Sequence, residues 1–431
     1  MNAKRSDDFA EKSFPDGAQR MYDLHLSAEQ LEIRDTVRDF VTRQVKLVVL
    51  KADRLDAGDR RLSMALLDQA SRLGMRTLTL AEDIGGAGAD QLTCAIVTEE
   101  LAAGDADIAA TLAETSRLAT LLFGSAMSTA QRERLLPLFA DNDRHQLAFA
   151  SREPGADTGL GVNYHRPVAA QSELKTTAVK SANGDWMVNG VKVCVANAPL
   201  AGLFAVAVKI PGRRSAAVLV VPSDAPGLTV RAHEHAWRHG SCGEVTFKDC
   251  RVPADNLIAD DAAELLAGHE ESGRGSVLMQ AVNLGIGRAA YEAALDYAKL
   301  RVQGGRPIVQ HQAIGTKLAE IAIKLEVARG AVWRAAWACD HPDAYADRSL
   351  ADLPLKTVAQ VFTAQAILEA TKDAAEIFGA MGVMRDMPLQ KYVHDARVCL
   401  NGGESQRDAK LRIAEALSGY RRASPTAVAA E

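Results

Sequence analysis

A glutamate beside two glycines lies near the end of the chain, in Asn401-Gly402-Gly403-Glu404-Ser405-Gln406-Arg407. A carboxylate can act as a general base when a loop brings it to a substrate. Adjacent glycines allow backbone conformations that are closed to other residues. The simpler interpretation is a solvated surface glutamate, and the residues alone leave both interpretations open.

Two further segments have residue types that suit ligand binding. Arg301-Val302-Gln303-Gly304-Gly305-Arg306-Pro307-Ile308 places arginine in a glycine-rich turn, and the arginine fork bonds phosphate in a bidentate manner. Ser151-Arg152-Glu153-Pro154-Gly155-Ala156-Asp157-Thr158 could present backbone N–H groups to a ligand. A surface arginine and a plain connecting loop are the simpler alternatives.

Three other patterns favour structural interpretations. His233, His235, His239 and Cys242 are zinc-ligand types, but no second cysteine or acidic residue follows at regular spacing, so a polar loop is favoured. Gly285-Ile286-Gly287-Arg288-Ala289-Ala290 fits a dinucleotide pattern, yet both flanks are helical where that motif needs a strand. We interpret these glycines as a close approach of two helices, and Gly85-Gly86-Ala87-Gly88 as a turn.

The elements that must position these residues follow from proline and periodicity. Seven of the fourteen prolines lie between Pro154 and Pro253, which predicts a β region between two helical regions. Before it, Ser27 and Gln30 form a capping box, Met64–Leu73 is helical, and Glu99–Ala119 is predicted as one helix. Predicted strands are 176–181, 186–195, 203–209, 216–221 and 244–248, and predicted helices follow from Ser276, including Leu355–Gly379.

Composition excludes several classes of protein. The 431 residues are 48% hydrophobic and 24% charged, with a net charge of −5, which argues against disorder and against a nucleic-acid-binding protein. No apolar run reaches the length of a membrane span, and the first twenty residues lack the apolar core of a signal peptide. Six scattered cysteines fit a reducing, cytoplasmic setting, so we expect a cytoplasmic protein.

Taken in order, nine motifs resemble the acyl-CoA dehydrogenase family over about residues 26–416. They are Leu26–Gln30, Glu82–Gly88, Arg152–Asp157, Val188–Lys192, Phe247–Asn256, Tyr297–Ile308, His311–Ala313, Phe378-Gly379 with Gly382, and Asp395–Arg397. The resemblance implies an α+β, mostly α fold: an N-terminal helical domain (26–146), a central β-barrel-like domain (147–262) and a C-terminal four-helix bundle (268–418). Residues 1–25 and 419–431 are then tails.

The same resemblance implies FAD, an acyl-CoA thioester substrate and a homotetramer, with electrons leaving through an electron-transfer flavoprotein. In the family a glutamate removes the α-proton while a hydride passes to the flavin. Arg301 and Gln312 match the pair that reaches the FAD of a neighbouring subunit, and Gly379 matches the glycine turn at the adenosine end. The matched positions also assign Phe149, Ser151, Ala196, Glu376 and Ser405 to the cofactor, and Thr158 and Arg274 to the substrate.

Several matched positions depart from the family pattern. Cys194 replaces an aromatic residue that packs on the flavin, and Ala196 replaces a threonine that bonds it. Glu376, Ala380 and Gly304 replace a glutamine, a glycine and an aromatic residue. We therefore expect weak flavin binding.

The position of the catalytic base departs most from the family pattern. The two positions that carry it in different branches of the family are Gly403 and Gly275 here, and the nearest carboxylates are Glu404 and Glu271. The leading expectation is a flavin-dependent acyl-CoA oxidoreductase that uses Glu404 as a displaced base. The alternatives are a relative with other chemistry (desulfination, flavin-dependent oxygenation or a non-redox thioester reaction) and a non-catalytic partner subunit of a heterotetramer.

Overall fold

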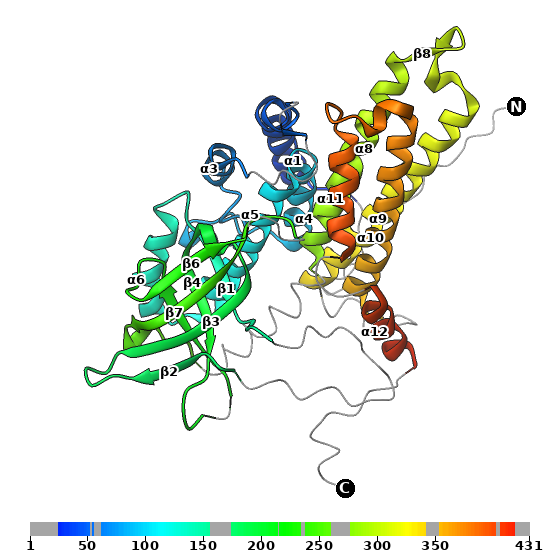
Figure 1. Ribbon diagram of the computed structural model, residues 1–431. Helices are drawn as coiled ribbons and strands as arrows, with labels where there is room; N and C mark the ends of the chain where they lie inside the picture. The colour runs from blue at the N-terminus through cyan, green and yellow to red at the C-terminus, as the bar shows by residue number, and fades with distance from the viewer. Residues whose placement is uncertain are drawn as a thin grey trace, which may run out of the picture.

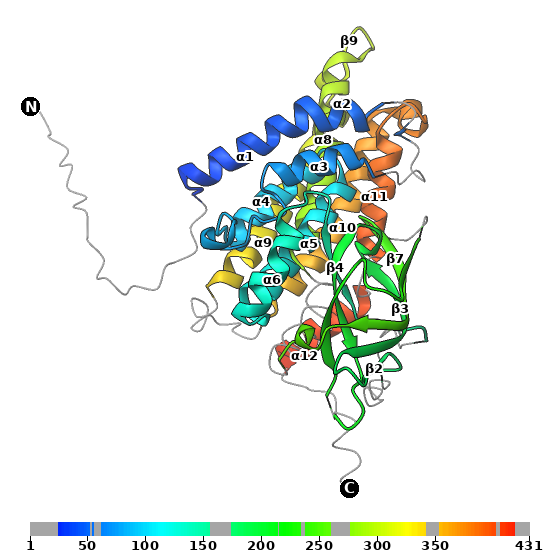
Figure 2. The same ribbon diagram turned by 90° about the vertical axis from the view of Figure 1, so that its left-hand side faces the viewer.

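A computed structural model describes residues 25–51, 54–55, 62–155, 174–213, 215–233, 238–259, 276–341, 353–401 and 406–418. The chain forms three successive parts (Figure 1). Helices come first, two small β-sheets follow, and long antiparallel helices end the chain. In the view from the side, the first helices lie between the β-sheets and the end of the bundle that carries the connection between α8 (Val277–Leu300) and α9 (Gln312–Asp340) (Figure 2). This arrangement confirms the predicted α+β, mostly α fold class.

The N-terminal helices begin at the predicted cap. Ser27 Oγ accepts from the backbone N–H of Gln30, whose side chain accepts from the backbone N–H of Ser27. The helices are α1 (Ala28–Phe40), α2 (Lys46–Val49), α3 (Met64–Arg72), α4 (Gln91–Ala102), α5 (Ala106–Ala119) and α6 (Thr129–Ala140), with π-helical turns at Val41–Val45 and Thr120–Ala126.

The prediction of one helix over Glu99–Ala119 is wrong, because α4 and α5 are separate helices. The break falls at Gly104, where a Cβ atom would lie 2.8 Å from Val41 Cγ1. The carboxylate of Asp105 then caps α5 by accepting from the N–H groups of Asp107 and Ile108, at 2.9 Å each. Such an N-cap starts a new helix and turns the chain.

Two sheets pack around one apolar core in the middle of the chain. The strands are β1 (Gln146–Ala150), β2 (Thr177–Lys180), β3 (Trp186–Ala196), β4 (Ala201–Val208), β5 (Ala217–Pro222), β6 (Leu228–Ala232) and β7 (Cys242–Val252). One sheet has the order β1-β4-β5 and the other β2-β3-β7-β6. The five predicted strands are confirmed as β2, β3, β4, β5 and β7. Sequence reasoning missed β1, which pairs with β4 in parallel, and β6.

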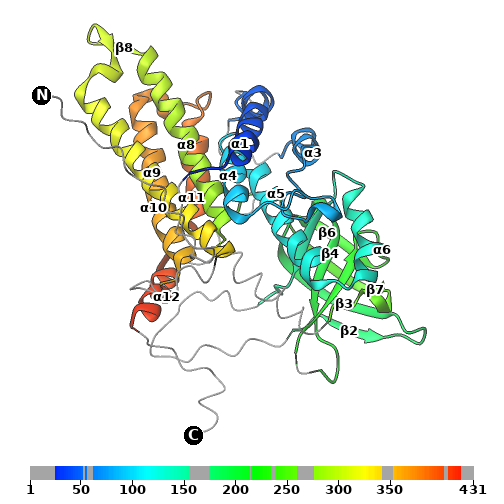
Figure 3. The same ribbon diagram turned by 180° about the vertical axis from the view of Figure 1, so that it is seen from behind.

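Long antiparallel helices form the C-terminal bundle (Figure 3). They are α8 (Val277–Leu300), α9 (Gln312–Asp340), α10 (Leu355–Ile377) and α11 (Leu389–Asn401), with α12 (Gln406–Ser418) against α10; the short hairpin β8 (Val302–Gln303) and β9 (Arg306–Pro307) joins α8 to α9. Gly285 and Gly287 bring neighbours close to α8, as predicted. A Cβ at Gly285 would lie 2.4 Å from the carbonyl oxygen of Glu99, and one at Gly287 would lie 2.8 Å from Ile367 Cδ1.

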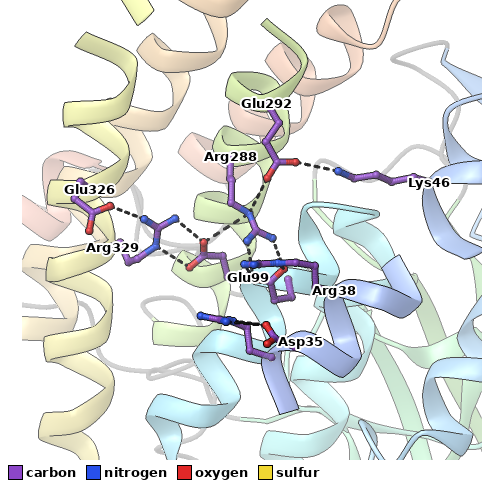
Figure 4. Close-up of polar contacts among 10 residues, drawn as sticks. Asp35, Arg38, Lys46, Glu99, Arg288, Glu292, Glu326 and Arg329 are labelled. Carbon is purple, nitrogen blue, oxygen red and sulfur yellow. Dashed lines mark hydrogen bonds and ion pairs between the residues drawn. The ribbon is translucent and has the colours of Figure 1, made fainter. Parts of the chain in front are cut away.

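A buried network of charges ties α1, α4, α8 and α9 together (Figure 4). Glu100 accepts from both guanidinium Nη atoms of Arg288, at 2.6 and 2.7 Å, and from Arg38 at 2.6 Å. Its neighbour Glu99 accepts from Arg329 at 2.8 Å. Burial raises the pKa of Glu100, but the hydrogen bonds from Arg288 and Arg38 outweigh that effect and hold it below its ordinary value. Glu100 therefore stays ionised inside the protein.

Among the helices of the described residues, none is long and apolar enough to cross a membrane.

Replacing Arg288 by methionine should destabilise the chain by roughly 3–5 kcal/mol, because it leaves a buried carboxylate without its main partner. The matched control is Arg43→Met, which removes an exposed ion pair with Asp39 and should cost about 1 kcal/mol or less. Urea denaturation midpoints measure both variants. Equal midpoints for the two variants would contradict the role assigned to Arg288.

Candidate functional site

A buried ion pair fixes the loop that follows β1. Lys192 Nζ, on β3, donates to Glu153 Oε1 at 2.9 Å and to the Ser151 carbonyl at 3.0 Å. Glu153 also accepts from the N–H groups of Lys175 and Thr176. Burial raises the pKa of Glu153, but these bonds outweigh it and lower the pKa to about 2. The loop that carries Ser151, together with Phe149 on β1, is therefore held against β3.

The end of β3 departs from regular strand geometry. The β3–β7 register is irregular between Lys192 and Val195, and Cys194 lies in the left-handed region with φ of 54°. Ala196 pairs with Cys242 on β7. Asn197, with φ of 59°, then donates from Nδ2 to the Thr111 carbonyl on α5 at 3.0 Å. The strand end that contains Cys194 and Ala196 is thus attached to α5.

His239 joins all three parts of the chain. It precedes β7, and its Nδ1 lies 3.2 Å from Asp107 Oδ1 on α5, while its Nε2 lies 3.0 Å from the Asp395 carbonyl oxygen on α11. Both oxygens can only accept hydrogen bonds, so this geometry favours an imidazolium that donates from both nitrogens. Burial lowers the pKa of His239, but contacts with the Cys399 thiol and the Asp107 carboxylate outweigh it and raise the pKa to about 10.

This position changes the interpretation of the histidine cluster. Sequence reasoning treated His239 and Cys242 as candidate metal ligands within a polar loop. In the structure His239 is only 3% exposed and its ring is held by protein oxygens, while Cys242 is buried on β7. No group of three metal-ligand side chains occurs among the described residues. The spacing of His239 gave no signal of its true partners, because Asp107 and Asp395 are distant in sequence.

Arg301 and Gln312 lie at the end of the bundle where α8 connects to α9, on either side of the β8–β9 hairpin (Figure 1). Both side chains are exposed. Gly304 and Gly305, with φ of 61° and 79°, make the hairpin turn, and His311 Nε2 donates to the Gln303 carbonyl oxygen at 2.9 Å. A Cβ at Gly304 would lie 3.4 Å from His311 Cε1, so His311 fills part of the space beside this position.

Glu376 and Gly379 lie at this same end. Glu376 forms an ion pair with Lys317, near the start of α9, and Lys317 also lies 3.6 Å from Asp373. Tyr297 on α8 stacks on Phe378 with ring centroids 4.1 Å apart, which fixes the turn at Gly379, where φ is 57°. The structure therefore brings Arg301, Gln312, Glu376 and Gly379 to one end of the bundle.

The predicted site residues fall into two separated groups. Phe149, Ser151 and Ala196 lie in the β part, whereas the Arg301 group lies at the far end of α8, a helix of 24 residues that spans about 36 Å at 1.5 Å per residue. Glu404, Ser405, Glu271, Thr158 and Arg274 lie outside the described residues.

The described residues fit FAD unequally. At the hairpin end, the exposed guanidinium of Arg301 has no carboxylate partner within the described part of the chain, so it is available to a pyrophosphate. Glu376 is already neutralised by Lys317. At the β3 end, Cys194 and Ala196, the positions that the resemblance assigns to the flavin ring, offer only a thiol and a methyl group. The residues at the hairpin end therefore suit the pyrophosphate of FAD, and the residues at the β3 end offer fewer contacts to its flavin ring.

Comparisons with known proteins agree on one family. Three family models match: "Acyl-CoA dehydrogenase, N-terminal domain" over residues 27–143, the middle domain over 169–250 and the C-terminal domain over 271–417. An acyl-CoA dehydrogenase of Bacillus subtilis is 31% identical over 385 residues, covering 87% of this chain and 94% of the relative. Benzylmalonyl-CoA dehydrogenase of Aromatoleum aromaticum is 29% identical, covering 92% and 100%. The solved butyryl-CoA dehydrogenase of Megasphaera elsdenii superposes with a TM-score of 0.76 at 25% identity, covering 92% of this chain and 100% of that one.

Replacing His239 by glutamine should destabilise the chain by roughly 3–5 kcal/mol at pH 6, since it removes one partner of a buried ion pair. A pKa raised from 6.5 to about 10 contributes stability that is complete below pH 6.5 and is lost as the pH rises through 10. The difference in urea midpoint between wild type and variant should therefore be larger at pH 6 than at pH 9.5. His145→Gln is the control and should show no such trend; a gap for His239→Gln that stays constant or widens toward pH 9.5 would rule out the buried imidazolium.

Proposed function

The chain belongs to the acyl-CoA dehydrogenase family, and from this premise we propose that it is a flavin-dependent oxidoreductase that acts on the CH–CH bond of an acyl-CoA thioester. The observation that carries this proposal is the near full-length match, with Arg301 and Gln312 both present and exposed. When bound, FAD would supply the two-electron acceptor. Arg301 and Gln312 would hold its dinucleotide end, and Phe149, Ser151, Ala196 and Ser405 would lie against the rest.

The protein's own task in this reaction is to remove the α-proton. We assign this role to Glu404, which follows two glycines and lies one residue past the family position at Gly403. Desolvation against an apolar acyl chain would raise the pKa of such a carboxylate toward the range useful for proton abstraction. The junction at Asp395 holds the middle of α11, the helix that ends three residues before Glu404 in the sequence. Thr158 and Arg274 are the proposed thioester contacts.

Replacing Glu404 by glutamine tests the base. The chain is reconstituted with FAD and assayed with an artificial electron acceptor across straight and branched acyl-CoA thioesters. Activity should fall by about 10²–10⁴-fold, the usual contribution of general-base catalysis. Glu271→Gln is the matched control and should retain activity. Loss of activity in Glu271→Gln with an unchanged Glu404→Gln would reassign the base, and absence of turnover in the wild type would remove the proposal.

A second candidate is a non-catalytic subunit that completes the FAD site of a homologue. The two groups of candidate cofactor residues favour it. Arg301 and Gln312 are present and exposed, while Cys194 and Ala196 replace the residues that would contact the flavin ring. Under this proposal the chain alone shows no turnover. Activity then appears when the chain is mixed with a homologous subunit in which the residue equivalent to Arg301 has been replaced.

Both candidates require an oligomer, and the bundle offers apolar side chains for one. Ile323 and Val327, one turn apart on α9, are 62% and 52% exposed, and Phe362 on α10 is 40% exposed. Apolar side chains gathered on an exposed face commonly mark an interface. We propose that these residues contact a second subunit, and that the assembly is a homotetramer or a heterotetramer.

Light scattering should give the purified chain a mass several times its own 46.1 kDa. Ile323→Glu should shift the mass toward one chain, because a charge is costly in a desolvated interface. The control is Leu47→Glu, where the replaced side chain is 66% exposed and belongs to α2 and not to α9 or α10. A wild-type mass near 46 kDa, or dissociation by Leu47→Glu alone, would contradict this interface.

A further inference from the structure

Two thiols lie beside each other at the irregular end of the β3–β7 ladder. Cys242 opens β7 and pairs with Ala196, and Cys194 precedes Ala196 by two residues. The two cysteines are therefore diagonal neighbours across two antiparallel strands. Cys194 is exposed, whereas Cys242 is 3% exposed. The Cys194 thiol is therefore accessible to a molecule in solution, and the Cys242 thiol is not.

One arginine lies beside this pair. Arg238 Nη1 donates to the Cys194 carbonyl at 3.3 Å. Burial raises the pKa of the Cys242 thiol, and the nearby Arg238 guanidinium opposes part of this increase. The nearby cation distinguishes Cys242 from Cys94 and Cys250, which are buried with apolar neighbours.

The backbone at Cys194 is the other unusual feature. Its φ of 54° is a conformation that L-residues rarely adopt, and it falls where the ladder register shifts between Lys192 and Val195. Diagonal Cα atoms in a regular ladder are about 7–8 Å apart, slightly beyond the limit of about 6.8 Å for a disulfide. Cys194 lies at an irregular, exposed position of β3, and closing the gap requires a small backbone shift there. Strained residues of this kind gather at functional sites.

We propose that Cys194 and Cys242 form a thiol–disulfide exchange pair whose substrate is a small organic disulfide. The Cys194 thiolate attacks one sulfur of the disulfide, whose S–S bond breaks, and the released thiolate takes up the proton that Cys194 lost. The Cys242 thiolate then attacks the sulfur of Cys194, and a second thiol leaves with the proton of Cys242. The two cysteines are oxidised to one disulfide, and the small disulfide is reduced to two thiols.

This proposal goes beyond the oxidoreductase function and requires no flavin. Its test measures the covalent mass of the protein and not enzymatic turnover. The exchange pair and the oxidoreductase function can therefore fail independently of each other. The full-length chain, freed of reductant, is incubated with glutathione disulfide in one arm and coenzyme A disulfide in another. Intact mass and peptide mapping without reduction should show the loss of two hydrogens and a Cys194–Cys242 link, and the faster arm identifies the preferred disulfide.

Variants separate the two steps. Cys242→Ser should trap one mixed disulfide on Cys194, and Cys194→Ser should abolish reaction at both positions. Cys339→Ser is the matched control, since this half-buried thiol is bonded to the Ala335 carbonyl, and it should react like the wild type.

A wild-type chain that stays unmodified, or that keeps a mixed disulfide on Cys194 without closing the link, would overturn the pair. So would linkage of Cys194 to any other cysteine. Should Cys242→Ser fail to fold, Cys194→Ser still decides the outcome, because the Cys194 side chain is exposed.

Discussion

A buried imidazolium is the point at which the three parts of this chain meet. His239 comes from the β part, Asp107 from the N-terminal helices and the Asp395 carbonyl from the bundle. An unpaired charge in this position would be very costly, so each part must arrive in the right place before the ring can be buried. The loops that surround the candidate site therefore depend on an interaction that none of the three parts can complete alone.

The same rule governs the other buried charges. Lys192 has no exposed side-chain surface, yet Glu153 and a carbonyl satisfy its ammonium group. Glu100 is matched by two arginines. Such groups are weak evidence for added stability, because desolvation offsets much of the attraction. Their effect is geometric: each fixes the relative position of the segments that it joins.

The long helices of the bundle separate the candidate functional residues into two half-sites. Arg301 and Gln312 lie at the hairpin end, and Ala196 lies in the β part. One chain cannot fold back to join these ends, because α8 is continuous between them. Under the proposed function each half needs a second subunit, and the exposed apolar residues of α9 are the proposed contact surface.

By itself the sequence determined the fold class, the cap at Ser27 and five strands, because caps, proline and alternation are local signals that need no partner. The ordered motifs also identified the family before any contact was known. Only the tertiary structure decided the break at Gly104, the parallel pairing of β1, and the partners of His239. Each of these depends on contacts between residues far apart in the chain, and such contacts leave no periodic trace in the sequence.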